Sequence, residues 1–143
     1  MNGFGRHVLE LDCEAEAARL GAWLRSTTAQ VLHRRGLVVA ISGGIDGSVC
    51  ATLAVRALGA ARVCLLILPE HDSDPDRAAR ARLLASHLGV ESLTFDIAPT
   101  LSAIGCYAER DAAVRSVLPE YGDGWRMKLA IAGGADGAIN RFR

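Results

Sequence analysis

The fold class that the sequence predicts is α/β, with a parallel sheet wound doubly by helices into three layers. Three observations predict it. Short, wholly apolar runs alternate with longer segments of helical composition, and that order is typical of parallel sheets joined by right-handed crossovers. In these runs polar residues do not alternate with apolar ones, which favours strands that are covered on both faces of the sheet. A glycine follows each of the first three helical segments, as expected at helix ends.

The chain has 143 residues, which is the length of one domain. Residues 1–12 are predicted to form an N-terminal arm. A helix is expected over residues 14–35, ended by Gly36. Its apolar stripe comprises Leu20, Leu24, Thr27 and Val31, with Trp23 beside it.

The central part of the chain predicts strand, helix, strand, helix and strand at residues 37–41, 46–58, 62–68, 75–88 and 92–97. The second of these helices has the clearest start. Asp74 is a favourable N-cap, and Pro75 suits the first helical position.

The last third of the chain gives a weaker pattern. Residues 100–117 predict one or two helices, and residues 121–124 predict a turn. Residues 127–132 and 138–142 flank a glycine-rich loop at 133–137, which indicates a C-terminal β-hairpin.

The segment most informative about function is Ser42 to Ser48, at the junction of the first predicted strand and the helix after it. Gly43 and Gly44 leave the backbone bare and tolerate positive φ, and the serines offer hydroxyl donors. A helix start presents free N–H groups and the positive end of the helix dipole, so this loop predicts a phosphate site.

Asp46 would repel a bare phosphate, but a Mg²⁺ ion between the two removes the conflict. A metal–nucleotide complex is therefore favoured over a free anion. A Walker loop is excluded because the only lysine is Lys128, and the glycines at 43, 44 and 47 do not fit the dinucleotide fingerprint. A plain strand–turn–helix corner with a capping aspartate is the structural alternative.

The loop Ser42-Gly43-Gly44-Ile45-Asp46-Gly47-Ser48 resembles the Ser-Gly-Gly-x-Asp-Ser loop of the PP-loop, or N-type, ATP pyrophosphatases. Its flanks are most similar to NAD synthetases, and the similarity covers residues 13–100. The resemblance implies an adenine nucleotide alpha hydrolase-like fold. It also implies ATP binding by Ser42, Gly43, Gly44, Ile45, Asp46, Gly47 and Ser48, with Asp46 as the Mg²⁺ ligand.

An NAD synthetase of this kind is a ligase of NAD biosynthesis. It cleaves ATP to AMP and pyrophosphate, adenylylates the carboxylate of nicotinic acid adenine dinucleotide, and lets ammonia attack. The resemblance thus implies small-molecule substrates, with ammonia from solution or from a partner, and a homodimer as one form of assembly. It identifies no catalytic base among these residues.

Two departures from the family pattern qualify this reading. Gly47 stands where the family has serine or threonine, and residues 101–143 lack the later Thr-Gly block whose acidic residue completes the metal site. Residues 13–143 are therefore expected to form a single nucleotide-binding domain, shortened at its C-terminal end. A non-catalytic ATP-binding module or fragment, or another PP-loop amide or sulfur transferase, remains as the alternative.

The charge balance, the apolar runs and the cysteine spacing indicate which partners and which cellular location to expect. Sixteen basic and sixteen acidic residues balance, which disfavours nucleic acid. No apolar run approaches the ~20 residues of a membrane span, and no signal peptide is visible. The four cysteines show no disulfide-like spacing, so a reduced, cytoplasmic location is expected.

Overall fold

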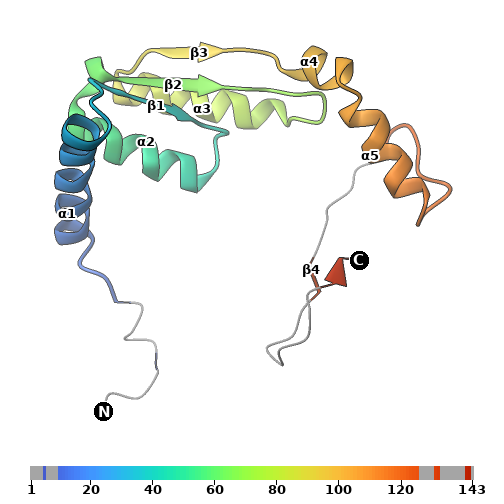
Figure 1. Ribbon diagram of the computed structural model, residues 1–143, viewed down its shortest axis with the longest axis horizontal. Coiled ribbons are helices and arrows are strands. Elements are labelled where there is room, and N and C mark those ends of the chain that lie inside the picture. Colours follow the sequence, from blue (N-terminus) through green and yellow to red (C-terminus); the bar gives the residue numbers. More distant parts are fainter. Residues whose placement is uncertain (1–4, 6–9, 126–130, 133–140, 143) are drawn as a thin grey trace. The chain divides into compact units, whose positions relative to one another are not determined.

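The computed structural model describes residues 5, 10–125, 131–132 and 141–142 (Figure 1). The chain divides into two compact units, residues 1–100 and residues 101–143. Most of the predicted arm at 1–12 lies outside the described residues.

The first unit is built on a parallel sheet with the strand order β1-β2-β3. The strands are β1 (Leu37–Ala40), β2 (Val63–Ile67) and β3 (Ser92–Thr94). Leu37 pairs with Val63, and Leu65 pairs with Ser92. The predicted α/β class and the parallel sheet are therefore confirmed.

Two helices, α2 (Ile45–Leu58) and α3 (Pro75–Leu88), lie against the same face of this sheet (Figure 1). Sequential strand order with right-handed crossovers requires this, because each connection then returns on the same side. Among the described residues the unit thus has two layers, where the sequence predicts three. The prediction of a third layer rests on the wholly apolar strands, which would be covered on both faces. The face of the sheet opposite α2 and α3 is indeed apolar.

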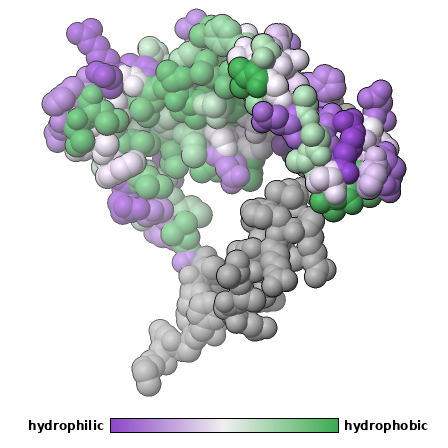
Figure 2. Space-filling model, turned by 45° about the vertical axis from the view of Figure 1, so that its right-hand side comes forward, coloured by the Kyte–Doolittle hydropathy of each residue, from purple (hydrophilic) through white to green (hydrophobic). Residues whose placement is uncertain are grey.

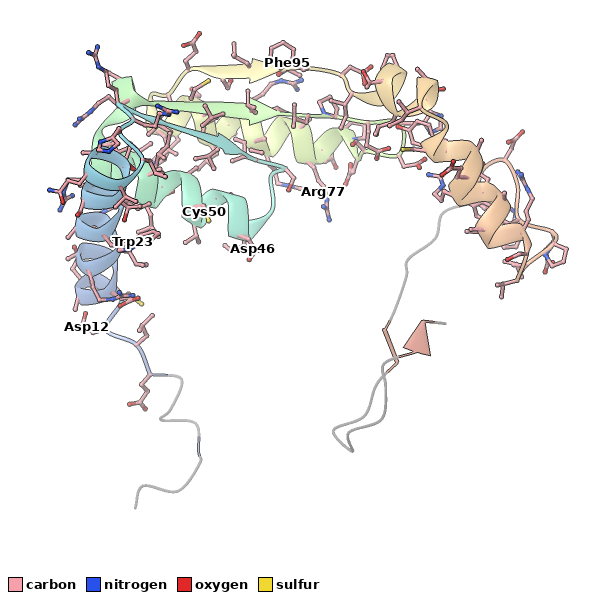
Figure 3. The ribbon with its side chains drawn as sticks, in the orientation of Figure 1. Asp12, Trp23, Asp46, Cys50, Arg77 and Phe95 are labelled. Atoms are coloured by element: carbon pink, nitrogen blue, oxygen red, sulfur yellow. The ribbon has the colours of Figure 1, made fainter. Side chains whose placement is uncertain are left out.

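That opposite face is exposed in the described part of the chain. Val38 is 65% exposed and Phe95, just after β3, is 55% exposed. Phe95 lies on the side of β3 that faces away from α3 (Figure 3). Figure 2 shows hydrophobic surface gathered over the sheet in the upper part of the view.

The core lies between the sheet and the two helices. Leu65, at the centre of β2, is fully buried, and small residues of both helices pack over it. Alanine at these positions lets a helix approach the sheet closely while keeping high helix propensity. The buried members include Ile41, Ala51, Ala54, Ile67, Ala81 and Ala85.

The first helix differs from its prediction. Helix α1 (Cys13–Ser26) passes into a π-helical turn, η2 (Thr27–Val31), and does not continue to residue 35. The wider turn shifts the helical phase, so Thr28 is buried and Val31 is 68% exposed. The predicted stripe through Val31 is therefore wrong at that residue, although Leu24 packs against the core.

The predicted bounds of the third helix are confirmed. The Asp74 side chain accepts a hydrogen bond from Asp76 N, Pro75 is the first residue, and Gly89 ends the helix in the left-handed conformation. Strands β2 and β3 are shorter than predicted, although Phe95 N and Ile97 N still donate to Ile67 O and Pro69 O. A short 3-10 turn, η3 (Ala60–Arg62), leads into β2.

The second unit contains α5 (Cys106–Arg115), preceded by α4 (Ala98–Ala103), which crosses the boundary between the units. Tyr121 is buried, packs edge-on against Trp125 at 6.1 Å between ring centres, and accepts a hydrogen bond from Arg115 Nε through its carbonyl. Strands β4 (Ile131–Ala132) and β5 (Arg141–Phe142) pair antiparallel, as the predicted hairpin requires. Its loop at 133–137 lies outside the described residues.

Among the described residues, no helix is both long enough and apolar enough to cross a membrane.

Candidate functional site

The Ser42–Ser48 segment lies at the carboxyl edge of the sheet. Ile41 N donates to Leu66 O at 2.8 Å, which continues the pairing of β1 and β2 up to the start of the loop. Ser42 follows directly and is exposed. In open α/β sheets, ligands bind beyond this edge of the strands, so the predicted phosphate loop lies where a ligand would be held.

Gly43 makes the turn and packs against a second helix. Its φ is +75°, in the left-handed region. A side chain there would also overlap the backbone carbonyl of Arg77, in the first turn of α3. Glycine at this position is therefore required by the fold of the loop, whatever the loop binds.

Gly44 is not equivalent to Gly43. Its φ is −86° and its ψ is 166°, an extended conformation typical of an N-cap residue. Gly44 thus does not use the positive φ that glycine tolerates, because the chain reverses one residue earlier, at Gly43. A β-carbon on Gly44 would come only within 3.5 Å of Ser42 Oγ, so the protein itself leaves room there.

The N-terminus of α2 has no side-chain cap. The capping residue is Gly44, which makes no side-chain hydrogen bond. The helices α1 and α3, by contrast, are capped by the carboxylates of Asp12 and Asp74. The first backbone N–H groups of the 14-residue helix α2 therefore point outward with the positive end of its dipole, as an anion site needs.

The side chains of the loop have distinct positions. Asp46 is exposed in the first turn of α2, and the structure gives its carboxylate no partner among the described residues. Ile45 is 75% exposed, so only its backbone faces the turn. Ser48 Oγ donates to Gly44 O at 2.8 Å. The Ser48 hydroxyl proton, which the sequence predicts to be donated to a phosphate oxygen, is therefore already used within the protein.

Gly47, where the resembling family has a hydroxyl residue, has room for a side chain. A β-carbon there would lie 3.5 Å from Ala40 O and from Ile41 Cα, at ordinary contact distance. The departure at Gly47 is therefore not imposed by packing.

The metal donors of the described residues are few. No group of three or more histidine, cysteine, aspartate or glutamate side chains gathers there. Mg²⁺ commonly takes one or two protein carboxylates and completes its shell with water and substrate phosphate oxygens. Asp46, unpaired beside the free N–H groups, fits that pattern as a single carboxylate ligand.

The loop after β2 makes contacts within itself and with the start of α3. His71 Nδ1 lies 3.0 Å from Asp72 Oδ1, Ser73 Oγ accepts from Glu70 N, and Asp74 caps α3. These acidic residues, which could have suggested a metal site, make local contacts instead.

Arg77 is a candidate that the sequence did not single out. Its backbone touches Gly43, and its guanidinium is exposed. Figure 3 shows Asp46 and Arg77 at the same edge of the sheet, from α2 and α3. The strong Asp74-Pro75 helix start predicts Arg77 in a first turn, but only the packing of the two helices brings it to the loop.

Comparisons with known proteins identify relatives of this chain. The family model described as NAD synthase matches residues 16–123. Curated NH(3)-dependent NAD(+) synthetases of Rhizobium meliloti and Mesorhizobium japonicum are 48% and 46% identical to the chain over 94% and 87% of its length. The chain spans only 40% and 39% of these two relatives.

Solved structures show the same fold. The NH3-dependent NAD synthetase from Campylobacter jejuni matches with a TM-score of 0.63 and 23% identity, over 77% of this chain and 50% of that one. The NMN synthetase of Francisella tularensis matches with a TM-score of 0.60 and 26% identity, over 71% of this chain and 41% of that one. The match of the family model to residues 16–123, together with the parallel sheet and its glycine loop, shows that this chain belongs to the NAD synthase family.

Proposed function

We propose that this chain binds ATP with Mg²⁺ at the Ser42–Ser48 loop, as the nucleotide-binding part of an ammonia-dependent NAD synthetase. The reaction would split ATP between its α and β phosphates and adenylylate the carboxylate of nicotinic acid adenine dinucleotide. Ammonia would then attack the adenylate to form the amide. The relatives named NH(3)-dependent NAD(+) synthetase support the reaction class.

The observation that carries the proposal is the uncapped start of α2. Gly44 leaves the N–H groups of the first turn free, and Gly43 turns the chain tightly against α3. A pyrophosphate group would receive these N–H donors together with the Ser42 hydroxyl. Fixed donors of this kind favour the negative charge that builds on the phosphates during cleavage.

Asp46 and Arg77 would act from either side of the bound phosphates. Asp46 would hold Mg²⁺, which supplies charge neutralisation and orientation when bound. The Arg77 guanidinium would pair with a phosphate oxygen in the planar, two-pronged geometry that arginine favours. Both side chains are exposed at the same edge of the sheet, so they are accessible to a nucleotide.

One observation favours a second reading, a module that binds ATP without turning it over. The described residues offer Asp46 as a single carboxylate and no cluster that would fix a metal rigidly. Mg²⁺ requires near-octahedral geometry, and loosely held reactants lose rate. Such a module would bind ATP with Mg²⁺ and release pyrophosphate slowly.

The test of binding is Asp46→Asn, measured by calorimetry of ATP with and without Mg²⁺. We expect the variant to lose most of the gain in affinity that Mg²⁺ gives, because the amide carries no charge for the metal. Asp123→Asn is the matched control, since Asp123 is exposed and has no recorded partner in the described part of the chain. Equal Mg²⁺-dependent ATP affinity in all three proteins would refute the proposed site.

A further inference from the structure

A concave site lies at the opposite end of the sheet from the loop. Its volume is about 440 Å³, within the range of small-molecule sites. It is formed where α1 and its π-helical turn meet the amino ends of β1 and β2. The lining residues are Arg25, Thr28, Ala29, Arg34, Arg35, Leu58 and Arg62.

The charge of this lining is one-sided. Four of its seven residues are arginines and none is acidic. Elsewhere among the described residues, Arg19, Arg56, Arg110 and Arg115 pair with carboxylates. The four arginines of the pocket, like Arg77, Arg80 and Arg82 of α3, have no carboxylate partner among the described residues. In a chain of zero formal net charge, this is a local excess of positive charge.

Two of the arginines are oriented by the end of α2. Arg62 Nε donates to Leu58 O at 2.7 Å, and Arg25 Nη1 lies 3.5 Å from Ala57 O. A guanidinium has five N–H donors, so each keeps several for a ligand. Arg34 and Arg35 have no hydrogen bond or ion pair to the described residues through their side chains, and both are exposed.

The backbone at this site is unusual and holds the arginines together. The π-helical turn Thr27–Val31 leads to His33, the one non-glycine residue of the described chain with positive φ, at +51°. A side chain on Gly36 would overlap the backbone carbonyl of Arg62. That close approach brings Arg34 and Arg35, before β1, beside Arg62, before β2. Such π turns and left-handed residues are over-represented at functional sites.

We propose that this arginine pocket binds a small oligophosphate, with the phosphate chain held by the four guanidinium groups. Arginine pairs with phosphate through two parallel N–H bonds. The four positive charges match the charge of a triphosphate near neutral pH. Leu58 and Ala29 add an apolar wall that would contact a base or sugar if the oligophosphate is a nucleotide.

The pocket is separate from the ATP loop. Arg34 and Arg35 precede β1 and Ser42 follows it, so the four residues of the strand, about 13 Å of chain, lie between them. The proposal therefore does not depend on ATP binding at Ser42–Ser48, and either one can fail while the other holds.

The experiment titrates the whole chain with inorganic triphosphate in the absence of Mg²⁺, followed by amide NMR shifts and calorimetry. We expect shifts concentrated at residues 25–36 and 58–62. Arg34→Gln/Arg35→Gln should weaken binding on the order of tenfold or more, because two charge-assisted contacts are lost. Arg80→Gln/Arg82→Gln, with the same charge change on exposed positions of α3, should change it less than about twofold.

Two further arms make the outcome decisive. Gly44→Val, which fills the phosphate space of the loop, should leave triphosphate binding at the pocket unchanged. In the Gly44→Val protein, equal affinities for ATP and triphosphate would show that the arginine pocket takes a free oligophosphate. Tighter binding of ATP than of triphosphate would show that it takes a nucleotide. Shifts confined to residues 42–48, or equal triphosphate affinity in both arginine double variants, would overturn the proposal. The NMR map of the unaltered chain gives this answer even if a variant fails to fold.

Discussion

The two adjacent glycines of the loop have different physical roles. Gly43 has positive φ and touches the backbone of Arg77, so the fold requires glycine there. Gly44 is extended, and a β-carbon there would meet only Ser42 Oγ, at the ordinary contact distance of 3.5 Å. The fold itself therefore does not require glycine at that position.

This difference predicts opposite behaviour for two substitutions. Gly43→Ala should lower the free energy of unfolding by about 2–5 kcal/mol, from the left-handed conformation and the overlap with α3. Gly44→Val should stay within about 1 kcal/mol of the starting protein, yet lose ATP affinity, because its branched side chain fills the phosphate space. Urea unfolding and ATP calorimetry on both variants measure the two effects. Two variants with the same stability loss would show that the assignment of roles is mistaken.

A third residue-scale prediction concerns Gly47. Gly47→Ser places a β-carbon at ordinary contact distance from β1 and should stabilise the protein by about 0.5 kcal/mol through helix propensity. ATP affinity should be kept or raised, since a hydroxyl is added where the resembling family has one. A folded Gly47→Ser protein with clearly weaker ATP binding would mean that the loop holds phosphate in another geometry.

At the scale of elements, the cap of α3 fixes the helical turn that packs against the loop. Asp74 accepts from Asp76 N and fixes the first turn of α3, the turn whose Arg77 carbonyl packs on Gly43. The position of the loop and that of the Arg77 side chain thus depend on the same helix start.

Asp74→Ala should cost about 0.5–2 kcal/mol of stability, as loss of an N-cap does, and should also weaken ATP binding. Asp12→Ala is the matched control, because Asp12 caps α1 through Glu14 N and Ala15 N, away from the loop. We expect Asp12→Ala to lower stability similarly while ATP affinity, measured by calorimetry, stays the same. An equal loss of ATP affinity in both variants would indicate a global effect and not a local one.

At the scale of the whole molecule, the described residues form the Ser42–Ser48 loop at the edge of the sheet but leave one face of the sheet exposed. Val38 and Phe95 are more than half exposed on that face, and the chain spans 40% of its R. meliloti relative. The relatives therefore contain much sequence with no counterpart here.

We accordingly predict that the purified chain binds ATP but turns it over orders of magnitude more slowly than a full-length relative, because a single carboxylate positions the metal loosely. The measurement is pyrophosphate release from ATP with nicotinic acid adenine dinucleotide and ammonia, beside the R. meliloti enzyme under the same conditions. Multiple turnover at a comparable rate would show that residues of this chain supply ligands that remain to be identified.

The sequence by itself determined what depends on neighbours along the chain. The α/β class, the Asp74-Pro75 start of α3 and the glycine ends at Gly59 and Gly89 follow from local pattern, and the structure agrees. The Ser42–Ser48 loop is likewise a local pattern, because a strand, a glycine turn and a helix start are consecutive in sequence.

Only the tertiary structure decided what depends on contacts between distant segments. Strand order put both helices on one face, and the packing of Gly43 on α3 brought Arg77 to the loop. Helix α1 ends in a π-helical turn that buries Thr28 and exposes Val31. This departs from the period of 3.6 residues that a regular α-helix would give. The arginine pocket likewise joins residues that precede two different strands, and such proximity arises from strand pairing, which no local pattern encodes.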